Sequence, residues 1–213
     1  MKAHAADMSI ANTLAHPGLQ LDSLGRWDRF MTINHRAYQF IKTHIEFYID
    51  SHNRDACFRI MEENKERFEK APGSTHNHQA WEGGYLDHIL ETMDIAYIIL
   101  PTLKLTGRPV PKFGDVILCL FLHDIEKPWK YVLGQNELDD PDLNTKTDRH
   151  EFRRKLIQLY GFELTEEQWN GIEYAEGEIH NYSNHKRNMG PLAALVHMCD
   201  VWSARGWPEY PHG

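Results

Sequence analysis

Apolar residues recur every three or four positions along most of this chain, which is the spacing of one face of an α-helix. The clearest case starts at Trp27 and runs to Ile49. Its apolar positions are Phe30, Ile33, Ala37, Phe40, Ile41, Ile45, Tyr48 and Ile49. We therefore expect an amphipathic helix over this stretch. Asn53 is a candidate N-cap for a second helix, which would end before Pro72 because proline disfavours helical backbone in the residue that precedes it.

The same periodicity predicts further helices over residues 85–100, 112–126, 148–160, 165–178 and 190–204. Pro101 and Pro128 should end the first two, since proline has no amide hydrogen to donate within a helix. Thr165 followed by Gln168 is a capping-box pattern at a helix start. A short stretch at residues 129–132 is the one candidate for a strand pair. The fold class is therefore predicted to be all-α.

Residues 1–25 contain two glycines and a proline, few regular apolar repeats and no motif. We expect them to form a loosely docked N-terminal arm, followed by a single helical core over residues 26–213. A chain of 213 residues can form one domain that buries roughly 70% of its unfolded surface. Residues 134–147 are polar and acidic, and should form a surface loop near the mouth of a site.

The composition is that of an ordinary soluble globular protein, with 41% hydrophobic and 25% charged residues. No run approaches the ~20 apolar residues of a membrane span, and the N-terminus lacks the apolar core of a secretion signal. A cytoplasmic location follows as an expectation. The cysteines at 57, 119 and 199 have no close-pair spacing and should be reduced core residues. The sequence leaves the oligomeric state open.

His123 and Asp124 close the apolar run of residues 116–122. Polar and charged side chains at the end of such a buried segment are costly unless something pairs with them, and a divalent cation is a suitable partner. The pair alone is a weak signal. It gains weight because His88 and Asp200 each lie on another helical segment that is otherwise apolar.

The order His88, His123-Asp124, Asp200 resembles the HD superfamily of metal-dependent phosphohydrolases. Residues 78–88, HQAWEGGYLDH, are similar to the HHAYxGGLLEH stretch in the HD domains of bacterial 3′-to-5′ exoribonucleases and their relatives, with Gln79 in place of the second family histidine. Residues 195–200, LVHMCD, are similar to the LHxxD pattern that precedes the family's last ligand. The likeness covers residues 72–205. It implies a single HD-domain helical bundle with a metal site between helices.

The resemblance also implies how many metal ions the protein holds. Bimetallic members carry extra histidines between the second and last motifs, where this chain has His150 and His180. The expected cofactor is therefore one or two divalent ions. A site of imidazoles and carboxylates without cysteine suits Mn²⁺, Fe²⁺, Co²⁺, Ni²⁺ or Mg²⁺. His197, one turn before Asp200, is expected to pack rather than to bind metal, and His76 and His78 either line the pocket or cap a helix.

The resemblance assigns candidate roles to neighbouring residues as well. The metal would lower the pKa of a bound water and neutralise phosphoryl oxygens, with Asp124 fixing the metal. Lys127 lies one turn beyond Asp124, so its ammonium can reach a phosphate held there. Glu91 and Glu126 are candidates for handling a proton, or for orienting a ligand histidine instead. Many such domains have a small residue where this chain has Glu126.

The expected substrate is a nucleotide or a similar small phosphate ester. A formal net charge of −8 disfavours long nucleic acid, because binding a strand usually requires a basic surface. Two other functions remain open. An HD-fold di-iron oxygenase would use the same six side chains to hold two irons, and a non-catalytic nucleotide-binding or regulatory module would use the fold without turnover.

Overall fold

The computed structural model describes residues 33–75, 78–107, 109–132, 143–178 and 182–206. The contacts divide the chain into two units, Met1–Ile33 and Asn34–Gly213. The predicted arm over residues 1–25 lies outside the described residues, and so does most of the predicted loop over residues 134–147. All candidate site residues belong to the second unit.

The first predicted helix is present as α2, which spans Ile33–Tyr48. The second is divided at Asn64 into α3, which spans Ser51–Glu63, and α4, which spans Lys65–Lys70. The predicted cap of α3 was wrong by one turn, because the N-cap is Asp50, whose carboxylate accepts a hydrogen bond from the Asn53 amide. Asn53 is instead buried inside the helix and donates to the Glu163 carbonyl oxygen. A buried amide that satisfies a distant carbonyl is a tertiary contact, which local sequence patterns do not reveal.

α5, the longest described helix, spans Gly84–Lys104 and therefore continues past Pro101, where we had predicted its end. Proline removes one hydrogen bond and crowds the preceding turn. Pro101 lies in the last turn and is exposed. The hydrogen bond that its own missing amide hydrogen would have made is therefore lost near the helix end, where it disturbs few other residues. The helix ends at Leu105, whose amide bonds the carbonyl oxygen of Thr102.

The helix predicted over residues 112–126 ends earlier than expected. It is α6, which spans Phe113–Leu122, and a second short helix, α7, follows over Lys127–Tyr131. Pro128 begins α7 rather than ending the preceding helix, since a proline in the first turn gives up a hydrogen that has no partner within the helix. The strand predicted at residues 129–132 is wrong, because residues 129–131 belong to this helix. His123 and Asp124 thus lie in the turn between two helices.

The last three predicted helices are confirmed. α8 spans Lys146–Leu159, α9 spans Glu166–Glu173 and α10 spans Pro191–Arg205. The predicted capping box is present at α9, where Thr165 and Gln168 bond each other's backbone amides. α9 ends five residues before the predicted position, ahead of a turn that contains Gly177 at a φ of 89°.

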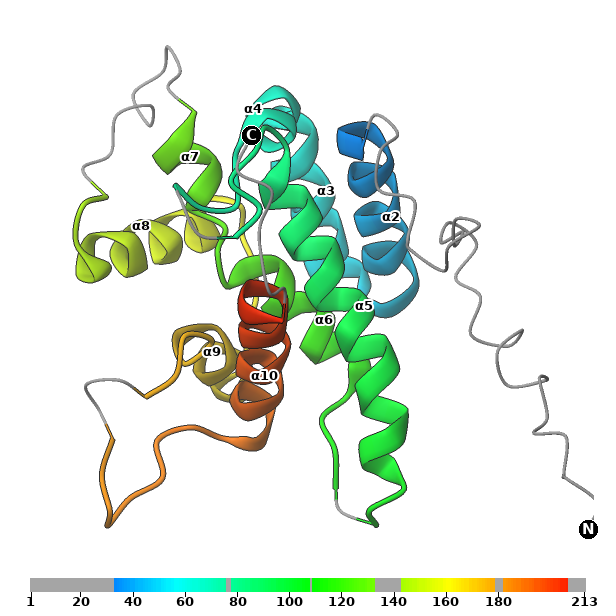
Figure 1. The fold of residues 1–213 in the computed structure, drawn as a ribbon, viewed down its shortest axis with the longest axis vertical. Helices are drawn as coiled ribbons and strands as arrows, with labels where there is room; N and C mark the ends of the chain where they lie inside the picture. The colour runs from blue at the N-terminus through cyan, green and yellow to red at the C-terminus, as the bar shows by residue number, and fades with distance from the viewer. Residues whose placement is uncertain (1–32, 76–77, 108, 133–142, 179–181, 207–213) are drawn as a thin grey trace, which may run out of the picture. The chain divides into compact units, whose positions relative to one another are not determined.

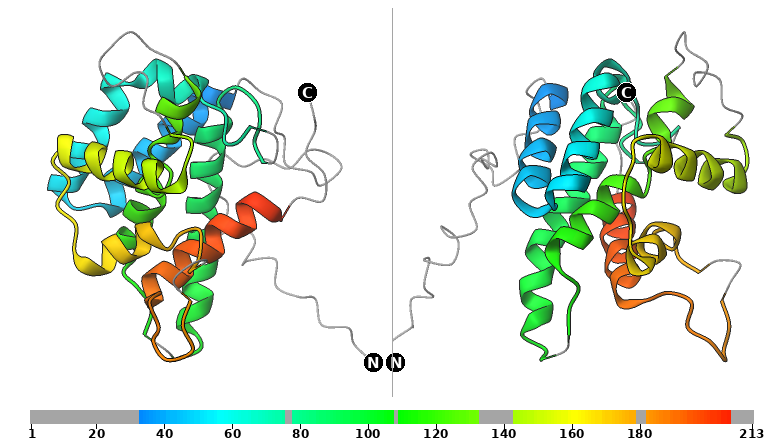
Figure 2. Two further views of the ribbon diagram at one scale, coloured as in Figure 1. Left: turned by 90° about the vertical axis from the view of Figure 1, so that its left-hand side faces the viewer. Right: turned by 180° about the vertical axis from the view of Figure 1, so that it is seen from behind.

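α6 lies at the centre of this unit and packs against α5, α9 and α10 (Figure 1). Its residues 116–122 are all buried, and each large apolar side chain buried there contributes roughly 1.5–3 kcal/mol. α8 and α9 lie on the opposite side of α5 and α6 from α2 (Figure 2). The described residues are all-helical, without a strand. Among them, no helix has both the length and the hydropathy that a membrane crossing requires.

Candidate metal centre

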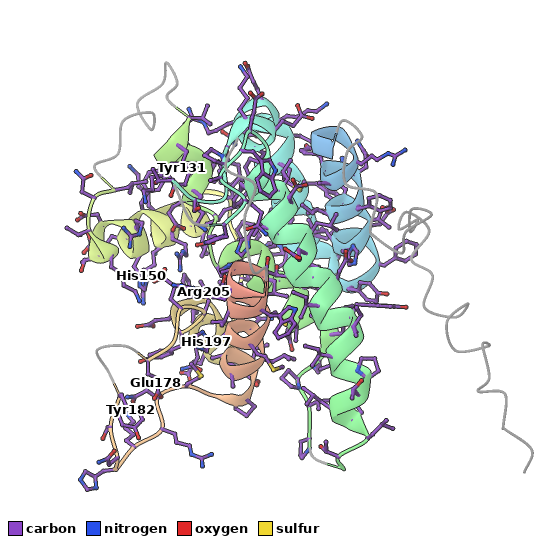
Figure 3. All side chains as sticks on the ribbon, in the orientation of Figure 1. Tyr131, His150, Glu178, Tyr182, His197 and Arg205 are labelled. Atoms are coloured by element: carbon purple, nitrogen blue, oxygen red, sulfur yellow. The ribbon has the colours of Figure 1, made fainter. Side chains whose placement is uncertain are left out.

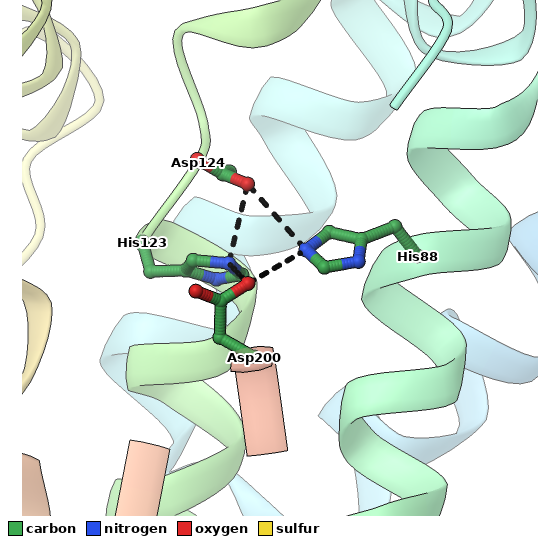
Figure 4. Close-up of side chains that lie close together, drawn as sticks. All are labelled: His88, His123, Asp124 and Asp200. Carbon is green, nitrogen blue, oxygen red and sulfur yellow. Dashed lines mark ion pairs between the residues drawn. The ribbon is translucent and has the colours of Figure 1, made fainter. Parts of the chain in front are cut away.

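Four side chains from separate parts of the sequence converge at the C-terminal end of α6 (Figure 4). His88 comes from the second turn of α5, His123 and Asp124 from the turn after α6, and Asp200 from α10. One ligand atom from each lies within 4.8 Å of all the others. These are the four residues that the motif order singles out, so the predicted grouping is present in the structure.

The spacing of these atoms suits ligands of one ion better than hydrogen-bonded partners. His88 Nε2 lies 3.5 Å from Asp124 Oδ2 and 3.2 Å from Asp200 Oδ1. His123 Nε2 lies 3.2 Å from Asp124 Oδ2 and 3.6 Å from Asp200 Oδ1. A charged N–H···O bond is about 2.7–2.9 Å long. Two ligands that each lie about 2.1 Å from one ion are about 3.0–3.4 Å apart at octahedral or tetrahedral angles.

The hydrogen bonds behind the two imidazoles determine which nitrogen carries the proton. His123 Nδ1 lies 2.8 Å from the Leu120 carbonyl oxygen, which can only accept, so Nδ1 donates. His88 Nδ1 lies 3.0 Å from Ser203 Oγ, and that hydroxyl gives its one hydrogen to Glu91 Oε2 at 2.8 Å. Ser203 therefore accepts from His88. In both rings Nδ1 carries a proton, so Nε2 is the nitrogen that faces the carboxylates and can take up either a proton or a metal ion.

Both Nε2 atoms are buried without a hydrogen-bond partner. A lone pair beside carboxylate oxygens is repulsive unless a proton or a metal ion lies between them. Two imidazole nitrogens and two carboxylate oxygens form a donor set that divalent cations prefer. The described residues in this arrangement therefore fit a divalent ion.

The electrostatics of the group favour added positive charge. Burial lowers the pKa of His123, but Asp124 and Asp200 outweigh burial and raise it to about 10. Burial raises the pKa of Asp124, but Lys127 and His123 outweigh it and hold that pKa well below its usual range. Both carboxylates therefore act as anions that stabilise any cation placed between them.

Lys127 lies at the same centre. Its Nζ is 2.5 Å from Asp124 Oδ2, the oxygen that also faces both histidines. Burial lowers the Lys127 pKa, but Asp124 outweighs burial and raises it, so the side chain remains an ammonium. Its reach toward a phosphate at the metal stays a prediction.

The two other predicted catalytic carboxylates are held in different ways. Glu126 is buried, and its two oxygens each accept a hydrogen bond of 2.9 Å from Arg153. Glu91 accepts from Ser203 and from Gln79 Nε2, each at 2.8 Å. Neither glutamate belongs to the group of four. Glu91 thus occupies the orienting position behind His88, and Glu126 is bound to a guanidinium.

The remaining predicted histidines lie elsewhere. His150 is on α8 and is not part of the group of four. Burial and Arg153 lower its pKa. His197 Nδ1 lies 2.7 Å from the Ala175 carbonyl oxygen, which is the packing role expected for it (Figure 3). His180 and His76 lie outside the described residues, so a second metal ion stays a prediction. His78 is described, and its ring centroid is 5.0 Å from that of His88.

Sequence reasoning missed three side chains that support the centre: Gln79, Arg153 and Ser203. Ser203 lies one turn after Asp200, so its position on the same helix face was a usable signal. The sequence marks Gln79 as a departure from the family motif but does not indicate its contacts with Glu91 and His78. Nothing in the local sequence connects Arg153 with Glu126, because that pair depends on how α8 packs.

Comparisons of the chain with protein-family models, with curated proteins and with solved structures find no match. A functional assignment therefore depends on the geometry of this centre and on the motif resemblance.

Proposed function

We propose that this chain is a metal-dependent phosphohydrolase of the HD type, which acts on a nucleotide or a similar small phosphate ester. One observation carries the proposal: two buried imidazole nitrogens without a hydrogen-bond partner face two carboxylates, and a buried lysine ammonium bonds one of those carboxylates. The ligand order along the chain matches the motif order, which adds support.

The charge of the centre indicates an anionic substrate. With both imidazoles neutral, as they must be to bind metal, two carboxylates and one ammonium give the group a charge of about −1, and a divalent ion would bring it to about +1. When bound, such an ion supplies a water of lowered pKa and neutralises phosphoryl oxygens. Lys127 can donate to a phosphoryl oxygen that gains charge in the transition state, since its ammonium has three donors and Asp124 uses one.

The exposure of the side chains supports one direction of approach for the proposed substrate. His88 and His123 are 0% and 1% exposed, whereas Asp200 and Lys127 are 15% and 14% exposed. Solvent therefore reaches the centre beside Asp200 and Lys127. A phosphate that enters there meets the lysine ammonium first, while the histidines remain shielded from solvent. Water exclusion behind the ligands strengthens their electrostatic interactions.

A small substrate is favoured over a long strand because the net charge is −8 and affinity for a strand depends on many cationic contacts with phosphates. A single phosphate group needs only the local charge at the centre.

The proposal can be tested by a phosphate-release screen with Mn²⁺, Co²⁺, Ni²⁺, Fe²⁺ or Mg²⁺ over mononucleotides, phosphodiesters and long RNA. Asp124→Ala should abolish release. Lys127→Ala should lower kcat/KM by about tenfold to a thousandfold without loss of metal. Lys130→Ala, one turn along the chain, is the matched control and should change kcat/KM less than twofold, on the order of 0.4 kcal/mol.

Three outcomes would contradict the proposal. Degradation of long strands without activity on any small ester would indicate an exonuclease. Metal binding without turnover of any phosphate compound would indicate a regulatory module, and iron-dependent oxygen consumption would indicate an oxygenase.

A further inference from the structure

Gln79 is the only non-glycine residue in the described ranges with a positive φ, at 41°. Left-handed backbone is costly for such a residue and persists only where its surroundings hold it in place. Two glycines do so here. The Gly73 amide donates to the Gln79 carbonyl oxygen at 2.9 Å, and a Cβ on Gly84 would lie 1.9 Å from the same oxygen. The turn fits only because residue 84 has no side chain.

The turn places the Gln79 carboxamide in the interior, where the side chain is 1% exposed. Its nitrogen lies 2.8 Å from Glu91 Oε2 and 3.3 Å from Ser203 Oγ. The other end, Oε1, lies 2.9 Å from His78 Nδ1. A glutamate carboxylate can only accept, so the amide group must face it and the carbonyl oxygen must face His78.

This orientation fixes protons on two rings. Because Gln79 Oε1 can only accept, His78 Nδ1 must donate to it, and the lone pair of His78 is then on Nε2. On the other side, Gln79 holds Glu91, which takes the Ser203 hydroxyl hydrogen and leaves Ser203 to accept from His88 Nδ1. One carboxamide is therefore connected to the proton positions of both His78 and His88.

We propose that Gln79 is a positioning residue that sets the tautomers of both His88 and His78. His88 then presents the lone pair of its Nε2 to the metal centre, and His78 carries its lone pair on its own Nε2, beside that centre. Supporting residues of this kind typically change metal affinity by 10–100-fold when removed. This inference rests on the proposed metal site, but the proton positions can be measured without metal or substrate.

The test is ¹⁵N–¹H correlation of the histidine ring nitrogens in the metal-free full chain at pH 8, together with Zn²⁺ affinity from chelator competition. Wild type should show Nδ1–H on both His78 and His88. Gln79→Met should shift the tautomers of both rings and weaken Zn²⁺ binding by about tenfold. Ser203→Ala should change His88 and leave His78 unaltered.

Two controls separate positioning from general loss of structure. Gln79→His keeps one donor and one acceptor, so it should restore both tautomers. Gln168→Met removes another buried glutamine, which bonds Asp115 on α6, and should lower stability without changing either ring. If Gln79→Met does not fold, Glu91→Met removes the acceptor of the Ser203 hydroxyl hydrogen and leaves the Gln79–His78 bond in place, so only His88 should change.

The inference fails if folded Gln79→Met keeps both wild-type tautomers, or if Glu91→Met has to be used and leaves His88 unchanged. Absence of Zn²⁺ binding in wild type would contradict the proposed function instead, and the tautomers of the metal-free protein would still decide the role of Gln79.

Discussion

The turn at residues 123–126 contributes side chains to two buried polar groups, which differ in how their hydrogen-bonding atoms are satisfied. In the Glu126–Arg153 pair, both carboxylate oxygens accept a guanidinium hydrogen at 2.9 Å, and both side chains are almost fully buried. In the group of four, two buried imidazole nitrogens have no hydrogen-bond partner and face carboxylates. The first group is complete within the protein, whereas the second has room for a cation.

The difference shows that burial of charge does not by itself identify a functional site. A complete buried ion pair holds structure together, and breaking it exposes the cost of the charge left behind. A cluster of buried polar atoms without partners is a candidate ligand site, because a bound ion would satisfy several of those atoms at once. Glu126 looked like a catalytic candidate from sequence because it is close to His123 along the chain, yet both of its oxygens are bonded to α8.

The largest expected effect concerns the complete pair. Arg153→Met should destabilise the protein by about 3–5 kcal/mol, because it leaves Glu126 buried and unpaired. Urea unfolding measures this change. Glu126→Leu combined with Arg153→Met should recover most of the loss, since two apolar side chains need no partner. A loss of less than about 1 kcal/mol in the free energy of unfolding of Arg153→Met would contradict the structural role of the pair. Loss of metal binding in the folded double variant would contradict its separation from the metal centre.

The next effect concerns the incomplete group. Metal at a hundredfold excess over Kd should stabilise wild type by about 2.7 kcal/mol, which raises Tm by roughly 5–10 °C in a chain of this length. Asp200→Asn keeps the shape of the side chain but removes its charge, so the rise should disappear. Calorimetry with and without Mn²⁺ gives both values. An equal rise in Asp200→Asn would place the metal elsewhere.

A smaller effect on stability should come from Asp94 on α5, which lies outside both groups. Its carboxylate lies 3.6 Å from His44 Nε2. Burial, followed by the charge of Glu91, raises its pKa to about 7. Its stabilising contribution is therefore complete below the unfolded pKa of about 3.9 and is lost as the pH rises to about 7.

Asp94→Asn should remove this loss. We expect the variant to exceed wild type by roughly 1–2 kcal/mol at pH 8, because solvent screening reduces the penalty of a side chain that is 23% exposed. The two proteins should be equally stable at pH 3. A difference that stays constant between pH 3 and pH 8 would show that titration of Asp94 is not its cause.

The sequence was sufficient for the parts that depend on local pattern. Apolar periodicity predicted the all-α class and most helices, and the motif order predicted which four residues converge. It failed where packing decides. Pro128 can start or end a helix, and only the turn after α6 determines which. Likewise the partner of Glu126 lies 27 residues away on α8, a distance over which local propensity carries no information.

The most direct test of the central claim is anomalous diffraction from crystals of the protein grown with Mn²⁺. We expect a strong anomalous peak about 2.0–2.3 Å from His88 Nε2, His123 Nε2 and the nearer oxygens of Asp124 and Asp200. Crystals in which these four side chains hydrogen-bond one another, with no anomalous density between them at saturating Mn²⁺, would contradict it.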